Sequence, residues 1–262
     1  MKILLVGDIV GGPGRRIFRD VVKRLREENA IQLVIANGEN AAAGNGITLA
    51  LAEELFKSGA DVVTLGDHVW GQKELETTIA GEKRLVRPLN YPAGAPGQGC
   101  VSLQTTYGPF VVVNLLGRVF MNPMDCPFRA MDALLKTLPS NVPVLVDFHA
   151  EATSEKIAMG YYLDGRVAAV FGTHTHVQTS DAMILPKGTA FITDLGMTGP
   201  MNSVIGREIA PVLKKFTTGI PAKFDVAGGP SVLEGAILEI DRQSGKAVSI
   251  TPYRFRENAV AG

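Results

Sequence analysis

The stretch MKILLVGDIVGGPG, residues 1–14, decides the predicted fold, because an apolar run ends there at an acidic residue and a glycine-rich turn. The run Lys2–Val6 has the length and composition of a buried strand. The turn Gly11–Gly14 follows it, and apolar residues then recur at helical spacing between positions 17 and 25. The N-terminus is therefore predicted to form a strand, a turn and a helix, which is how an α/β fold begins.

Apolar runs and helical segments keep alternating over the first two thirds of the chain. Further strands are predicted at residues 33–36, 61–65, 101–106, 110–115, 142–148 and 168–171, and helices at 48–56, near 126–137 and from about 154. The Pro- and Gly-rich residues 81–99 are expected to form a long irregular loop. Beyond residue 189, strands are predicted at 191–194, 222–227, 232–241 and 247–256, with one helix near 206–216. Alternating βα units followed by antiparallel strands predict an α/β fold of two packed sheets flanked by helices, with residues 1–262 as one domain.

The composition is that of an ordinary globular protein and argues against several functional classes. Of the 262 residues, 46% are hydrophobic and 20% are charged, and the formal net charge is zero. A neutral chain without long basic runs does not resemble a protein that coats nucleic acid or a membrane surface. No apolar run reaches the ~18 residues of a membrane span, and the apolar N-terminus is too short for a signal peptide. We therefore expect a cytoplasmic protein with no membrane partner and no extended nucleic-acid surface.

Side chains of the kind that bind metal ions follow five of the predicted strands. In chain order they are Asp8, then Glu39 and Asn40, then Asp67 and His68, then His149, and finally His174 and His176. All four histidines of the chain belong to this group. Because ligands bind outside the carboxyl ends of the strands in an open α/β sheet, we expect these side chains to meet at one edge. The sequence therefore predicts a metal site, with every member except His68 as a ligand.

The number and type of donor atoms indicate which ions this site would bind. A mixture of oxygen and nitrogen donors favours Mn²⁺, Fe or Zn²⁺ over Ca²⁺ and Mg²⁺, which prefer oxygen alone. Seven donor residues exceed the needs of one tetrahedral ion and suit two ions that share a carboxylate. We expect two divalent or trivalent transition-metal ions per chain, with Mn and Fe favoured and Zn as the alternative.

Five segments carry a resemblance to a known family. They are GDIVG (7–11), NGENAA (37–42), DFHAEATSEK (147–156), GTHTHVQT (172–179) and ITDLGMTGP (192–200). Together they resemble the YmdB-like family of calcineurin-like metallophosphoesterases, which are bacterial phosphodiesterases. The resemblance implies the calcineurin-like fold, a two-sheet sandwich flanked by helices. It also implies that Asp8, Glu39, Asn40 and His176 hold one ion, and that Glu39, Asp67, His149 and His174 hold the other.

The same resemblance implies the reaction and the residues that contact the substrate. Family members hydrolyse phosphodiesters, so a small phosphodiester or a cyclic nucleotide such as 2′,3′-cyclic AMP is the expected substrate. The expected mechanism is attack on phosphorus by a hydroxide that the two ions activate. His68 is implied as a proton donor or phosphate ligand. In the expected mechanism, Asn40 is a further candidate contact to the phosphoryl group. Arg118, which follows a predicted strand, is a candidate phosphate contact.

One ligand position departs from the family pattern. The third motif normally reads GNH, whereas this chain has Gly66-Asp67-His68. Asp67 still offers an oxygen, but its charge is expected to hold the ions more tightly and to attract an anionic substrate less. An alternative function is therefore a regulatory protein that binds metal and nucleotide with little turnover.

Three further hypotheses concern residues around this site and the assembly of the chain. The turn Gly11–Gly14 could form a phosphate cradle, although its spacing matches no nucleotide-binding motif. Asp147 and Asp194 are candidates for orienting a ligand histidine. The antiparallel strands at the C-terminus could supply an edge for a homo-oligomer.

Overall fold

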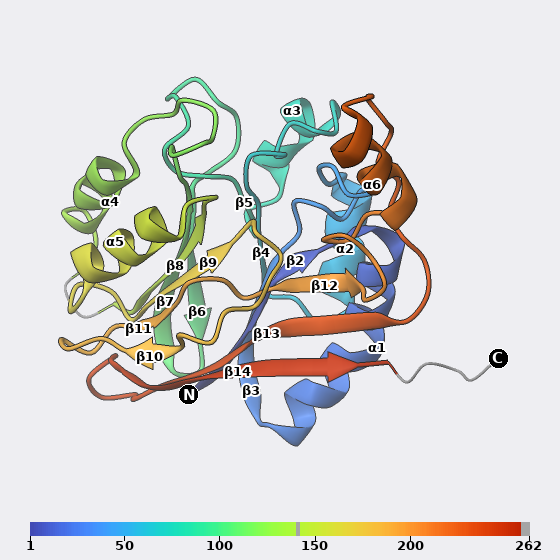
Figure 1. The fold of residues 1–262 in the computed structure, drawn as a ribbon. Helices are drawn as coiled ribbons and strands as arrows, with labels where there is room; N and C mark the ends of the chain where they lie inside the picture. Colours follow the sequence, from blue (N-terminus) through green and yellow to red (C-terminus); the bar gives the residue numbers. More distant parts are fainter. Residues whose placement is uncertain (140–141, 258–262) are drawn as a thin grey trace.

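Two β-sheets pack face to face at the centre of the molecule, and helices cover both outer faces (Figure 1). The computed structural model describes residues 1–139 and 142–257. The outer helices are α1 (Gly11–Glu28) and α2 (Leu49–Lys57) on one side, and α4 (Pro127–Leu135) and α5 (Thr153–Leu163) on the other. The short elements α3 (Leu75–Thr78) and η1 (Ile79–Gly81) and the helix α6 (Ile209–Thr218) lie at one end of the sandwich. The predicted two-sheet sandwich flanked by helices is confirmed. None of the helices in the described ranges has the length and apolar character needed to cross a membrane.

The larger sheet combines the first strands of the chain with the last ones. Its eight strands are β1 (Lys2–Val6), β2 (Asp8–Ile9), β3 (Ile31–Asn37), β4 (Val62–Thr64), β5 (Leu85–Val86), β12 (Met197–Pro200), β13 (Ser231–Ile240) and β14 (Ala247–Arg256). β1, β3, β4 and β5 run parallel, so their carboxyl ends reach the same edge. β13 lies antiparallel to both β1 and β14, which joins the C-terminal part of the chain to the N-terminal βα units.

The smaller sheet is built from the middle of the chain. Its six strands are β6 (Cys100–Thr105), β7 (Gly108–Leu116), β8 (Val144–His149), β9 (Ala169–Thr173), β10 (Met183–Ile184) and β11 (Ala190–Ile192). β6 and β7 form the predicted antiparallel hairpin. β7, β8, β9 and β11 run parallel, which directs the carboxyl ends of this sheet to one edge as well.

Three apolar clusters fill the interfaces between the four layers. The strand β1 shows how the sequence assigns side chains to two of them, since Ile3 and Leu5 join the cluster between the sheets. Leu4 and Val6 point the other way and join the cluster beneath α1 and α2. A third cluster packs the smaller sheet against α4 and α5. Alternation with a period of two is what a strand buried on both faces requires.

Three of the predicted segments differ from the structure, and the short elements β2, β10, β12, α3 and η1 were not predicted. The segment 81–99 is not irregular throughout, because the two residues of β5 pair with β4; so short a strand has no readable period. Residues 222–227 do not form a strand, and only Val226 makes an isolated bridge, to Arg207. Residues 11–14, which are Gly-Gly-Pro-Gly, form the first turn of α1 rather than a turn before it. A side chain at Gly14 would collide with the carbonyl of Thr198, so glycine lets α1 lie close to β12.

Candidate metal centre

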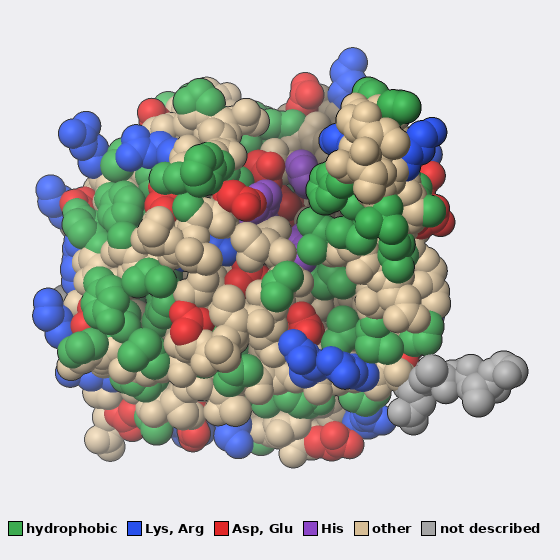
Figure 2. Space-filling view, viewed as in Figure 1, with side chains coloured by type: hydrophobic (Ala, Val, Ile, Leu, Met, Phe, Trp, Pro, Cys, Tyr) green, Lys and Arg blue, Asp and Glu red, His purple; other side chains and the backbone are tan. Residues whose placement is uncertain are grey.

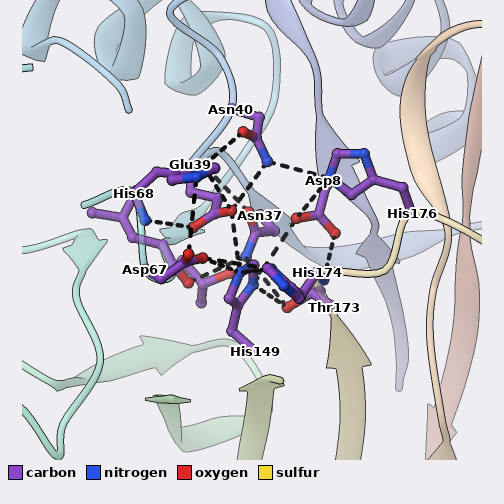
Figure 3. Close-up of polar contacts among 12 residues, drawn as sticks. Asp8, Asn37, Glu39, Asn40, Asp67, His68, His149, Thr173, His174 and His176 are labelled. Atoms are coloured by element: carbon purple, nitrogen blue, oxygen red, sulfur yellow. Dashed lines mark hydrogen bonds and ion pairs between the residues drawn. The ribbon is translucent and has the colours of Figure 1, made fainter. Parts of the chain in front are cut away.

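The predicted ligands lie together where the carboxyl ends of both sheets meet (Figure 3). The larger sheet contributes Asp8 after β1, Glu39 and Asn40 after β3, and Asp67 and His68 after β4. The smaller sheet contributes His149 at the end of β8, and His174 and His176 after β9. Convergence at one edge follows from the parallel direction of these strands. Gly66 allows Glu39 and His149 to lie close to the backbone that precedes Asp67, because a side chain at position 66 would collide with both residues.

Four of these residues form a compact group of donor atoms. One ligand atom each from Glu39, Asp67, His149 and His174 lies within 4.8 Å of all the others. His149 Nε2 is 3.1 Å from Glu39 Oε1 and 3.1 Å from Asp67 Oδ1. His174 Nδ1 lies 3.0 Å from the same Nε2 atom. Two carboxylate oxygens and two imidazole nitrogens directed at one point form a donor set suited to a transition-metal ion.

The remaining predicted ligands surround a second point, next to the first. Asp8 is fully buried, and within the described ranges its Oδ1 atom accepts no hydrogen bond. This oxygen lies 3.7 Å from His176 Nε2. The Asn40 Nδ2 atom lies 3.3 Å from the same Nε2 atom and donates a hydrogen bond to Glu39 Oε1 at 3.1 Å, while the Asn40 Oδ1 atom lies beside His68. A buried carboxylate oxygen without a partner is costly, and a cation between these groups would satisfy it.

Each of the three ligand-like histidines has an oxygen acceptor beside the ring nitrogen that faces away from the donor cluster. The acceptors are Thr173 Oγ1, 2.9 Å from His149 Nδ1; Glu151 Oε2, 3.1 Å from His174 Nε2; and the Ile205 carbonyl, 2.9 Å from His176 Nδ1. An acceptor at that position keeps the proton on the outer nitrogen, so the inner nitrogen presents its lone pair to an ion.

Asp147 influences a ligand histidine indirectly, through a threonine. The Thr173 hydroxyl donates to Asp147 Oδ1 at 2.7 Å and lies beside His149 Nδ1. Thr64 donates to the other carboxylate oxygen. Burial raises the pKa of Asp147 to about 6. The sequence analysis suggested that Asp147 orients a ligand histidine. In the structure, Thr173 lies between Asp147 and His149.

Asp194 supports the backbone that carries the last two histidines. Its Oδ2 atom accepts hydrogen bonds from Thr175 N at 3.2 Å and from Thr175 Oγ1 at 2.6 Å. The same atom forms an ion pair with buried Lys156 at 2.7 Å. His174 and His176 have φ angles of 97° and 63°, a left-handed conformation that non-glycine residues rarely adopt. Such strain costs of order 1–3 kcal/mol per residue and persists at functional sites where surrounding contacts enforce it.

The ionisable groups shift one another strongly in the absence of ions. Burial raises the pKa of Asp8. Burial also opposes ionisation of Asp67, but hydrogen bonds from His149 and His174 outweigh it and hold the Asp67 pKa below its usual value. Burial alone would lower the pKa of His149, yet the charge of Glu39 and the hydrogen bond to Asp67 raise it well above its usual value. The negatively charged cluster therefore favours a bound proton, and a metal cation could take the place of this proton.

A cavity of about 240 Å³ opens above the donor cluster. Figure 2 shows histidines and acidic side chains exposed together in this hollow of the surface. His68 lines the cavity with its ring 39% exposed, and its Nδ1 atom lies 3.1 Å from Asn40 Oδ1.

Arg118 does not line this cavity. Its guanidinium lies 3.5 Å from Cys126 Sγ, and its backbone N–H donates to Glu155. Arg207 does line the cavity. No motif in the sequence marks Arg207, because its position depends on contacts between distant segments.

Comparison with known proteins places this architecture in a family. A model of the family described as YmdB-like protein matches residues 4–253. The chain is 47% identical over 251 residues to a protein of Bacillus subtilis (strain 168) named 2′,3′-cyclic-nucleotide 2′-phosphodiesterase, with 95% of each chain covered.

Two solved structures share the whole fold. A crystal structure of a hypothetical protein from Thermus thermophilus is 44% identical and superposes with a TM-score of 0.93, covering 98% of this chain and 100% of that one. A crystal structure described as a novel phosphatase from Mycoplasma pneumoniae is 35% identical, with a TM-score of 0.94, 99% of this chain covered and 95% of that one. The similarity therefore extends over both sheets and the strand ends that carry the donor cluster.

Proposed function

Because this chain belongs to the YmdB-like family, we propose that it is a metal-dependent phosphodiesterase that hydrolyses cyclic nucleotides such as 2′,3′-cyclic AMP. The reaction class agrees with the phosphodiesterase and phosphatase names of its relatives. One observation of the structure carries the proposal. Carboxylates and three histidines gather around two neighbouring points, and each histidine has an oxygen acceptor beside its outer nitrogen.

We propose that the site holds two ions, with Glu39 shared between them. The first set consists of Asp8, Glu39, Asn40 and His176, and the second of Glu39, Asp67, His149 and His174. The central position of Glu39 supports this division, because its Oε1 atom lies 3.1 Å from the Asn40 amide and 3.1 Å from His149 Nε2. The mixed donor set favours Mn or Fe, with Zn as the alternative.

The side chains around the cavity would bind the substrate and move protons. Divalent ions at such a site lower the pKa of water and offset the charge of the phosphoryl group. The Asn40 oxygen accepts a hydrogen bond from His68 Nδ1 and so fixes the orientation of the ring. His68 Nε2 then remains to donate a proton to the leaving alkoxide.

The competing function is a regulatory protein that binds metal and nucleotide with little turnover. The carboxylate of Asp67 is the feature that favours it, because the added charge weakens the attraction of an anionic substrate. Incubation of the metal-loaded protein with 2′,3′-cyclic AMP, followed by chromatography of the products, separates the two functions. Appearance of a nucleoside monophosphate that stops when EDTA is added supports the enzyme, whereas binding of the cyclic nucleotide without product supports the regulatory protein.

Domain organisation and assembly are further parts of this proposal. The pairing of β13 with β1 supports one domain over residues 1–262, because the C-terminal strands complete the sheet that the N-terminus begins. β14 pairs with β13, and no strand of the described ranges pairs with its other edge. This edge could pair with a second copy in a homo-oligomer. Cytoplasmic localisation stays a prediction of the sequence.

A further inference from the structure

Arg207 is the one lysine or arginine that lines the cavity above the donor cluster, within residues 1–139 and 142–257. The other ionisable side chains of this lining are Glu39, Glu151 and histidines. A phosphodiester that enters the cavity is an anion, so a cation in the wall is well placed to attract it.

The guanidinium of Arg207 is held entirely by neutral carbonyl groups. Its Nη1 atom donates to the carbonyl of Ala43 at 3.2 Å and to that of Phe224 at 3.0 Å. Its Nη2 atom donates to the carbonyl of Gly44. These bonds use three of the five N–H groups of the side chain. Across the described ranges, Arg207 forms no ion pair, so no carboxylate contacts its positive charge.

Two N–H groups of the guanidinium remain. One is on Nε and the other is the second N–H of Nη2, and neither has a partner in the part of the chain that the structure describes. Guanidinium N–H groups bind the oxygens of a phosphate or carboxylate through charge-assisted hydrogen bonds. The carbonyl contacts leave these two N–H groups available and also restrain rotation of the planar group.

The backbone around Arg207 fixes its distance from the donor cluster. Two residues earlier, the Ile205 carbonyl accepts a hydrogen bond from His176 Nδ1. On the other side, Arg207 contacts the loop that follows Glu39 and Asn40, and a side chain at Gly44 would collide with the guanidinium. Gly44 has a φ of 82°, a conformation that also favours glycine. The arginine is therefore tied both to a ligand histidine and to the loop that carries two further ligands.

We propose that Arg207 binds the phosphoryl oxygens of the substrate through these two N–H groups, and so contributes to substrate affinity at the metal centre. The proposal rests on the proposed phosphodiesterase function, because it names the residue that recognises the anionic part of that substrate. It assigns to Arg207 the phosphate contact for which the sequence had suggested Arg118.

The test is a calorimetric titration of the metal-loaded protein with inorganic phosphate, which requires no turnover. Arg207→Gln is expected to raise the Kd for phosphate at least about tenfold, since it removes charged hydrogen-bond donors. Arg129→Gln, which changes an exposed arginine on α4, is the matched control and should leave the Kd unchanged. Arg118→Gln tests the rival residue. Metal content and the thermal midpoint are measured for every variant.

Each outcome decides for or against the proposal. An unchanged phosphate Kd in Arg207→Gln with both ions bound would overturn it, as would a larger loss in Arg118→Gln. If Arg207→Gln loses its ions, the Arg207→Lys variant decides, because lysine keeps the charge but not the two free guanidinium N–H groups. A weaker phosphate Kd at full metal content then supports the proposal, and loss of ions in this variant too would assign Arg207 to holding the loop.

A steady-state assay on 2′,3′-cyclic AMP separates phosphate binding from contact with the base. A raised KM together with a raised phosphate Kd supports the proposal. A raised KM with an unchanged phosphate Kd would place Arg207 at the base and overturn it. If the wild-type protein hydrolysed no phosphodiester, the proposed function would fail, while the phosphate titration would still test Arg207.

Discussion

The Thr173 hydroxyl lies 2.9 Å from Nδ1 of His149, so a side chain on β9 determines which ring nitrogen of a β8 histidine is free. The same hydroxyl donates its proton to Asp147 at 2.7 Å. Because its proton is engaged there, the oxygen accepts from His149, and Nδ1 must carry the imidazole hydrogen. His149 Nε2 is left facing Glu39 and Asp67. The buried Asp147 thus orients a candidate metal ligand without touching it.

This relay predicts the effect of Thr173→Val. Valine has the shape of threonine and suits a strand, so the fold should be retained, but His149 loses the acceptor that sets its tautomer. We expect the affinity for metal to fall about 10- to 100-fold, as when other groups that orient metal ligands are removed. Competition with a chelator measures this change. Thr64→Val is the matched control, because Thr64 bonds to Asp147 but not to His149. Equal losses in the two variants would contradict a specific role for Thr173.

His68→Ala should separate metal binding from proton transfer. The ring lines the cavity and lies outside the group of four clustered ligands, so both ions should remain. Loss of a general acid typically lowers kcat about 10²- to 10⁴-fold. Turnover and elemental analysis of the same sample measure the two quantities. His149→Ala, by contrast, should lose metal. Full activity of His68→Ala would show that the role assigned to His68 is wrong.

Asp67→Asn tests the departure from the family pattern. The amide keeps an oxygen ligand but removes one negative charge, which lies 3.1 Å from His149 Nε2. We expect metal affinity to fall by about tenfold, and the KM for a phosphodiester to fall as well, because repulsion of the anion is reduced. Chelator competition and steady-state kinetics measure these effects. A higher KM at full metal content would be inconsistent with the electrostatic explanation.

Metal binding should depend on pH through His149. Without ions its pKa is raised well above the usual value, so the ring is protonated at neutral pH and must lose that proton to bind a cation. Apparent metal affinity should therefore fall as the pH decreases, and binding should release about one proton from this residue. Calorimetry at pH 7 in two buffers with different ionisation enthalpies measures the release. A binding enthalpy that is identical in both buffers would mean that His149 is neutral beforehand.

Much of the donor cluster could be predicted because it depends on chain direction alone. Asp8, Glu39 and His149 each follow an apolar run, and parallel strands bring the residues that follow them to a common edge. The alternation of Ile3 and Leu5 with Leu4 and Val6 likewise reflects the period of a strand buried on both faces. These features are encoded locally, so one sequence reveals them.

The remaining features depend on contacts that no local pattern records. Hydrogen bonds to the carbonyls of Ala43, Gly44 and Phe224 hold Arg207 at the cavity. Ala43 and Gly44 lie far from Arg207 in the sequence, and Phe224 follows α6. Thr173 acquires its role only when β9 pairs with β8. The predicted strand at 222–227 had the right composition, but no strand of the described ranges lies beside it to form a ladder. Composition can indicate a strand, whereas pairing requires a neighbour.

The most direct test of the central claim is a metal count made together with an assay on one sample. The purified protein is analysed for bound elements and assayed on bis-p-nitrophenyl phosphate and 2′,3′-cyclic AMP, before and after removal of metal with EDTA. The account predicts about two transition-metal ions per chain, turnover that disappears with the ions, and recovery when Mn²⁺ is restored. Two ions without turnover would favour the regulatory function. A protein that binds no transition metal under any loading condition would contradict the account.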